Sequence, residues 1–74
     1  MRDYLIELRA KTGLTQADVA KKIGISEPYY QMIESGKRQK NMDITLAAKL
    51  SDVFSVPMDQ LVKEEAKLAQ TTKY

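Results

Sequence analysis

The basic side chains of this sequence gather between residues 9 and 40, where they could bind a partner. The 74 residues include 12 Lys or Arg and 10 Asp or Glu, and the net charge of +2 says little by itself. The charged residues of 9–40 are Arg9, Lys11, Lys21, Lys22, Lys37, Arg38 and Lys40 against Asp18, Glu27 and Glu34. Because a local excess of positive charge attracts phosphate groups, nucleic acid is the first partner to consider.

The composition gives little support to catalytic or metal chemistry. The sequence contains no Cys and no His. Without Cys there is no thiolate nucleophile or soft metal ligand, and without His the commonest general base and metal ligand is missing. The acidic residues stand singly on predicted helix surfaces, and no nucleophile lies beside a base. We therefore expect no enzyme activity, no metal, no cofactor and no small-molecule substrate.

Length and apolar content predict one small domain. A chain of 74 residues, 43% of them apolar, is near the lower limit for independent folding. Residues 1–62 are expected to form the domain, with 63–74 as a C-terminal helical extension or tail. The apolar runs are far shorter than the ~20 residues that span a bilayer, and residues 1–4 do not lead into a signal peptide. A cytoplasmic location without a membrane partner is expected.

Apolar residues recur every three or four positions and no stretch alternates as a strand does, so an all-α fold is predicted. The first helix is expected at about 2–11, with Gly13 as its left-handed cap. The second follows Thr15, which forms a capping box with Asp18. The predicted core positions of these two helices are Leu5, Leu8, Val19, Ala20 and Ile23.

Three further helices are expected. Ser26 is the predicted N-cap of the third, which ends near Ser35, and Asp43 is the predicted cap of the fourth. Pro57 begins the last helix. Their predicted core positions are Tyr30, Ile33, Ile44, Ala47, Leu50, Phe54, Met58, Leu61 and Val62.

The second and third helices form a unit of their own. Only Gly24-Ile25-Ser26 joins them, and the small Ala20 lies where one helix must approach the other closely. Two short helices joined in this way make a helix-turn-helix. A plain helical hairpin could show the same spacing by chance, and that alternative stays open. The inward positions of the pair are Val19, Ala20, Ile23, Ile25, Tyr30 and Ile33.

Motifs that carry a family resemblance extend over roughly residues 3–62. They are Leu8-Arg9, Gly13-Leu14-Thr15-Gln16, Val19-Ala20, Ile23-Gly24-Ile25-Ser26, Ile33-Glu34-Ser35-Gly36-Lys37-Arg38, Leu50, Phe54-Ser55-Val56 and Leu61. In order and spacing they resemble the Xre/Cro-type (lambda repressor-like) regulators, which include the phage repressors and Cro. The resemblance implies a compact five-helix fold, transcriptional repression or activation, and binding to double-stranded DNA at paired operator half-sites. It also implies a bacterial or prophage setting and association with the nucleoid.

A few positions depart from the family pattern. The loop after Arg38 is longer than usual, Ser55 stands where the family often has glycine, and Pro57 replaces a usual serine cap. These positions lie at the rear of the expected fold. Tyr29-Tyr30 is bulkier than the usual small-plus-aliphatic pair, which leaves the roles of these two side chains open.

In such a protein the outer side of the third helix enters the major groove and reads base edges. The candidate readers are Glu27, Pro28, Tyr29 and Met32. Glu27 can accept a hydrogen bond from cytosine N4, and Met32 or Pro28 can contact a thymine methyl. Two alternatives remain: Tyr29 could bond a phosphate instead, and Glu27 could serve only as an acid that favours the helix N-terminus.

Phosphate contacts would hold that helix in register. Gln16 can offer its amide and the N–H groups at its helix end. The other candidates are Ser26, Lys37, Arg38 and Lys40, although Lys40 fits a solvated loop equally well. The resemblance also implies a bidentate ion pair between Arg9 and Glu34 that fixes the recognition helix.

One module of this size contacts too few bases to select a site in a genome, so a homodimer is predicted, with half-sites about 34 Å apart or a multiple of it. A stripe of Leu61, Val62 and Leu68 with Ala66 and Ala69 could be its interface, and a frayed tail is the alternative. Two other functions stay open. One is an antitoxin that binds a toxin and represses its own operon, and the other is a helical adaptor that binds protein only.

Overall fold

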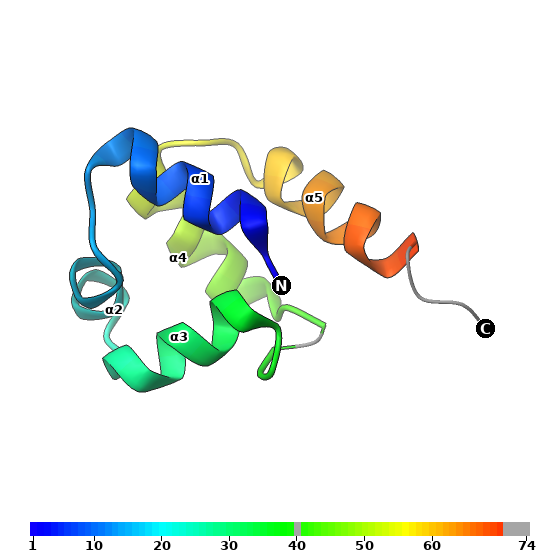
Figure 1. The fold of residues 1–74 in the computed structure, drawn as a ribbon. Coiled ribbons are helices and arrows are strands. Elements are labelled where there is room, and N and C mark those ends of the chain that lie inside the picture. The colour runs from blue at the N-terminus through cyan, green and yellow to red at the C-terminus, as the bar shows by residue number, and fades with distance from the viewer. Residues whose placement is uncertain (40, 71–74) are drawn as a thin grey trace.

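The described part of the chain folds into five helices. The computed structural model describes residues 1–39 and 41–70, with side chains up to residue 68. The helices are α1 (Asp3–Thr12), α2 (Gln16–Ile23), α3 (Glu27–Ser35), α4 (Ile44–Phe54) and α5 (Met58–Gln70), and no strand occurs in the described residues. The predicted all-α class and order of helices are confirmed (Figure 1).

Side-chain caps set where the helices begin. The Thr15 hydroxyl accepts from the Asp18 N–H at 3.1 Å, and the Asp18 carboxylate accepts from the Thr15 N–H at 3.0 Å. Ser26 accepts from the Tyr29 N–H at 3.2 Å. These bonds satisfy N–H groups that have no partner inside the helix. The predicted starts of α2 and α3 are therefore confirmed.

Two left-handed residues set where α2 and α4 end. Gly24 has φ 77°, which lets the chain turn from α2 into α3 within the three residues 24–26. Ser55 caps α4 with φ 55° and ψ 44°, a conformation that costs a residue with a Cβ about 1–2 kcal/mol. The serine that departs from the family pattern thus occupies a position that suits glycine.

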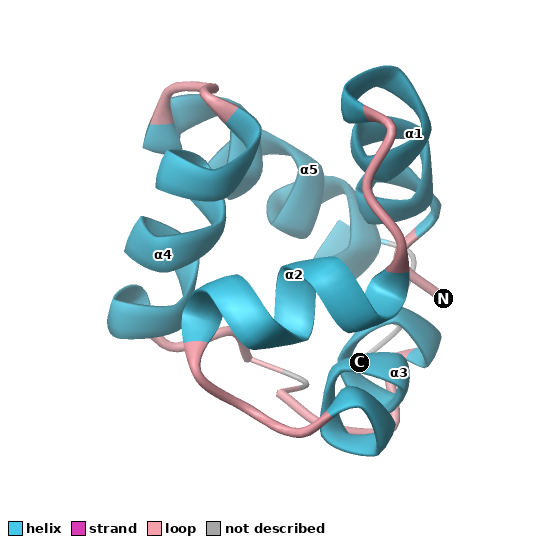
Figure 2. Ribbon diagram, turned by 90° about the vertical axis from the view of Figure 1, so that its left-hand side faces the viewer, coloured by secondary structure: helices cyan, strands magenta, loops and turns pink. Residues whose placement is uncertain are grey.

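One apolar core joins all five helices. Its buried residues are Leu5, Leu8, Val19, Ala20, Ile23, Tyr30, Ile33, Leu46, Ala47, Leu50, Phe54 and Leu61. In Figure 2 α2 crosses the front of the molecule between α4 and α1, with α3 beside it. The core thus lies behind α2 and α3 and holds both from the inner side.

Two predicted core residues, Ile44 and Val62, are exposed, a third, Met58, is only partly buried against the core, and the interface stripe needs correction. Ile44 is 76% exposed because it is the first residue of α4 and lies roughly 100° around the helix from the buried face. Leu46 is buried in its place. Val62 is 59% exposed, whereas Leu61 is only 1% exposed. Leu61 therefore cannot belong to an exposed stripe on α5, because its own core already covers it.

A helix that spans a lipid bilayer needs about 20 mostly apolar residues, and this sets a limit for the described helices. None of them is long and apolar enough to cross a membrane.

Candidate nucleic-acid interface

Helices α2 and α3 are held at a fixed angle by their shared turn and by the core. The Ile25 N–H donates to the Ala20 carbonyl at 3.0 Å, which closes the turn onto the end of α2. On α3, Tyr30 and Ile33 have no exposed surface. Its opposite side, which carries Glu27, Pro28 and Met32, faces away from the core and is exposed. A rigid helix is therefore presented with one side free.

The exposed side of α3 brings three of the four predicted base readers together. Glu27 and Pro28 form the first turn of the helix, and the Gln31 amide donates to Glu27 at 3.4 Å. Met32 follows one turn after Pro28 and is 36% exposed. Residues four apart on a helix lie on the same side. The surface they form combines a carboxylate with apolar groups.

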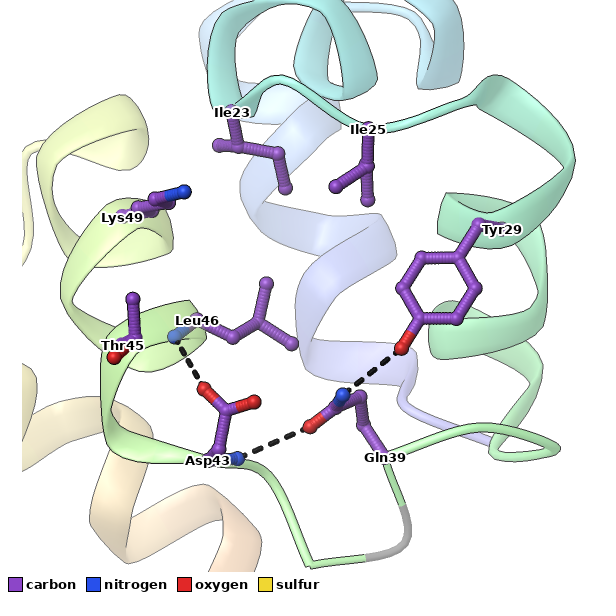
Figure 3. Close-up of a pocket in the computed structure, with 8 residues that line it drawn as sticks. All are labelled: Ile23, Ile25, Tyr29, Gln39, Asp43, Thr45, Leu46 and Lys49. Carbon is purple, nitrogen blue, oxygen red and sulfur yellow. Dashed lines mark hydrogen bonds between the residues drawn. The ribbon is translucent and has the colours of Figure 1, made fainter.

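Tyr29, the fourth predicted reader, has a different environment. Its side chain is half-buried, and its hydroxyl accepts from the Gln39 amide at 2.9 Å. The Gln39 side-chain oxygen accepts from the Asp43 N–H at 3.1 Å, and Asp43 caps α4 by accepting from the Leu46 N–H at 2.7 Å. Figure 3 shows this chain of bonds along one side of an open pocket. Tyr29 thus links α3 to the start of α4.

The side chains that were predicted to contact phosphates differ in how many of their donor groups remain available. Gln16, the first residue of α2, donates its amide to Glu34 at 2.9 Å, which leaves one amide N–H. Ser26 uses its oxygen as the cap of α3 and keeps its hydroxyl proton. Lys37 and Arg38 are exposed directly after α3. Lys40 lies outside the described residues.

Arg9 and Glu34 form a bidentate ion pair between α1 and α3. Nε donates to Oε2 at 2.6 Å, and Nη2 donates to Oε1 at 3.2 Å. The Glu34 side chain is 3% exposed and that of Arg9 is 18% exposed. Burial alone would raise the pKa of Glu34, but the hydrogen bonds from Arg9 and Gln16 outweigh it and hold that pKa below its ordinary value. Glu34 therefore stays charged and fixes α3 to α1 and α2.

The Tyr30 hydroxyl is buried beside this ion pair and makes no hydrogen bond of standard geometry. Burial, and then the neighbouring Glu34 carboxylate, raise the pKa of Tyr30 above its usual value. We expect Tyr30→Phe to change the free energy of unfolding by less than about 1 kcal/mol, because the hydroxyl makes no hydrogen bond of standard geometry and only adjoins the Glu34 carboxylate.

Tyr29→Phe is the matched control for this change, because its hydroxyl does have a partner in Gln39. The control should lose about 0.5–1.5 kcal/mol. Urea titration of both variants measures the difference. A larger loss in Tyr30→Phe than in Tyr29→Phe would contradict the expectation.

Sequence reasoning missed Arg2. Its side chain is 3% exposed, and it pairs with Glu65 of α5 at 2.7 Å. The two residues are 63 positions apart, and no local pattern connects them. In the described residues, no three His, Cys, Asp or Glu side chains lie together so that they could hold a metal ion.

Two short helices in this arrangement, with the outer side of α3 exposed and basic residues after it, define a helix-turn-helix DNA-binding protein. A family model described as helix-turn-helix matches residues 5–61. The chain belongs to this family, in its Xre/lambda repressor-like branch, whose members are DNA-binding transcriptional regulators.

Similar proteins support this family assignment. Two proteins of Archaeoglobus fulgidus, each described as an uncharacterized HTH-type transcriptional regulator, are 38% and 33% identical over 61 residues, which is 82% of this chain. The match covers 84% and 83% of their own lengths. The propionyl-CoA carboxylase regulator of Cereibacter sphaeroides is 39% identical over 62 residues, or 84% of this chain but 13% of that protein. No solved structure gives a significant match.

Proposed function

We propose that the chain is a repressor that binds paired operator half-sites as a homodimer, with α3 in the major groove of each. One observation carries this proposal: α3 is anchored from behind by Tyr30 and Ile33 while its other side is exposed. A helix fits the ~12 Å width of the groove, and a rigid mount fixes which side chains reach the bases. A repressor needs no more than this, since occupying an operator is enough to block transcription.

Base reading in this proposal belongs to the first turns of α3. Glu27 accepts from cytosine N4, and Pro28 and Met32 contact thymine methyl groups. Tyr29 lies deeper, at the edge of this surface, and its hydroxyl proton is free to donate to a phosphate because Gln39 already supplies the bond that the oxygen accepts. We therefore assign Tyr29 a phosphate contact and a role in holding the loop.

Phosphate contacts on both sides of α3 hold it in register. The donors that precede α3 in the sequence are the remaining amide N–H of Gln16 and the hydroxyl of Ser26. The donors that follow it are the side chains of Lys37 and Arg38. Lys40 is proposed to extend this last group. These contacts carry affinity but no sequence information.

Pairing supplies the remaining specificity. Val62 and Ala66 are apolar residues exposed on α5, and they support a homodimer through this helix. Leu61 cannot take part, because it is buried in the core of its own subunit. A symmetric pair would read a palindromic site.

Selection of bound duplexes from a random pool tests the proposal. We expect a palindrome with half-sites about 34 Å apart or a multiple of it. Glu27→Ala and Met32→Ala should each relax one base position by about 1–3 kcal/mol of discrimination. Glu7→Ala, which removes an exposed carboxylate from α1, is the matched control and should keep the profile.

Three other outcomes would each remove part of the proposal. A single half-site without a repeat would contradict the homodimer. An unchanged profile in both α3 variants would contradict the assignment of readers. If no duplex is retained at low salt, a protein-binding adaptor becomes the better interpretation.

A further inference from the structure

Outside the recognition surface, the side chain of Arg2 donates five of the hydrogen bonds in the described residues. Arg2 has 2% of its surface exposed. A guanidinium carries five N–H donors. Nε donates to Glu65 at 2.7 Å, Nη1 to the Ile33 carbonyl at 2.6 Å and to the Arg38 carbonyl at 3.2 Å, and Nη2 to Glu65 at 3.1 Å and to the Gln39 carbonyl. All five donors are therefore used.

These bonds join three separate parts of the fold. Ile33 lies in the last turn of α3, Arg38 and Gln39 lie in the loop that follows, and Glu65 lies on α5. The Arg2 N–H also donates to the Glu34 carbonyl at 2.7 Å. In Figure 1 the chain begins between the end of α3 and α5. Arg2 thus bridges the end of the recognition helix and α5.

Glu65 is held in turn by a second residue. The Tyr4 hydroxyl donates to the same carboxylate oxygen that accepts from Arg2 Nε. Glu65 lies one turn after Leu61, which is 1% exposed, so the two residues share the inner side of α5. The carboxylate is therefore fixed from both α5 and α1, and it can orient the guanidinium.

The loop that Arg2 holds is the loop that carries the exposed cations. The N–H groups of Lys37 and Arg38 donate to the Met32 carbonyl at 2.9 and 3.2 Å, which closes the end of α3. In the next part of the loop, the Arg2 guanidinium donates hydrogen bonds to the carbonyls of Arg38 and Gln39. Gln39 has φ 58°, a conformation that few residues other than glycine adopt. With its carbonyls fixed, the backbone determines where the side chains of Lys37 and Arg38 leave the surface.

We infer that Arg2 and Glu65 are positioning residues for DNA binding: they brace the loop after α3 against α5 so that Lys37 and Arg38 meet the phosphates beside the groove. This inference rests on the proposed function. A buried ion pair often adds little net stability, and fixing one geometry is the role that remains. The consequence is that a change on α5, which carries none of the proposed DNA contacts, weakens phosphate contacts after the recognition helix.

Glu65→Ala tests the brace, with Glu64→Ala as the matched control. Glu64 is the neighbouring carboxylate and forms only a 3.7 Å pair with the exposed Lys67. We expect Glu65→Ala to bind the selected duplex about tenfold more weakly near 0.1 M salt, with the slope of log affinity against log salt reduced by about 1, as for one lost phosphate contact. The base preference should not change. In the free protein, hydrogen exchange at the Lys37 and Arg38 amides should become faster.

Equal affinity, slope and exchange in the two variants would overturn the inference. If Glu65→Ala does not fold, Tyr4→Phe removes only the hydroxyl bond to Glu65, and it should shift slope and exchange in the same direction. Unchanged values there would equally overturn it. The exchange measurement needs no DNA. Failure of the wild-type protein to bind any duplex would therefore contradict the proposed function, while exchange would still decide whether Glu65 holds the loop.

Discussion

Arg9→Ala is expected to lower the free energy of unfolding by about 2–4 kcal/mol, because it leaves a buried carboxylate without its ion-pair partner. The side chain of Glu34 is 3% exposed, so water cannot replace the lost guanidinium. For a domain of this size the melting temperature should fall by about 10–25 °C. Lys11→Ala removes an exposed cation from the same helix and should change the melting temperature little.

The pH dependence gives the same ion pair a second test. The folded pKa of Glu34 lies below its ordinary value of 4.5. A carboxylate of this kind contributes stability above pH 4.5, and the contribution is lost as the pH falls through the folded pKa. The difference between wild type and Arg9→Ala should therefore be largest near pH 7 and should shrink in acid. A small difference that stays constant with pH would contradict this account of the pair.

The parts of the fold that could be predicted depend on short-range chemistry. Thr15 with Asp18, and Ser26 with the Tyr29 N–H, each act within three residues, so the sequence itself shows where α2 and α3 begin. The turn at Gly24 is equally local. These features define the helix-turn-helix before any tertiary contact is considered.

The predictions of buried and exposed residues were wrong where the spacing of apolar residues along a helix did not determine which side of the helix is covered by the rest of the protein. Ile44 fits the spacing of a core residue, but as the first residue of α4 it has little of the protein beside it. Leu61 and Val62 are adjacent apolar residues, and only the way α5 packs decides that the first is buried and the second exposed. Spacing predicts a stripe, whereas its exact direction is set by the neighbouring helices.

The network around the recognition helix shows the same limit. Tyr29 follows Glu27 and Pro28 in sequence, but its bond to Gln39 depends on how the loop returns toward α4. Gln16 was predicted as free to bind phosphate, and half of its donor capacity is used by Glu34. Arg2 and Glu65 form an ion pair although they are 63 positions apart in the sequence. Such contacts need the tertiary structure, because each partner alone looks like an ordinary surface residue.

The double substitution of Lys37→Ala with Arg38→Ala is expected to have the largest effect on DNA affinity. Both side chains are exposed, so folding should change by less than about 0.5 kcal/mol. Losing two phosphate contacts should weaken binding by roughly 50–100-fold near 0.1 M salt and reduce the salt slope by about 2. The preferred base sequence should stay the same, because phosphate contacts carry no direct sequence information.

The matched control is the double substitution of Lys21→Ala with Lys22→Ala, which removes the same charge from the exposed end of α2. If the two cations after α3 contact phosphates directly, this control should retain most of the affinity and nearly the full slope. Charge at a distance acts through a screened field, which falls off over about 10 Å in 0.1 M salt. Equal losses in the two double variants would therefore mean that only net charge matters, and would contradict a specific role for Lys37 and Arg38. A loss confined to the loop variant would place these two residues at the DNA backbone.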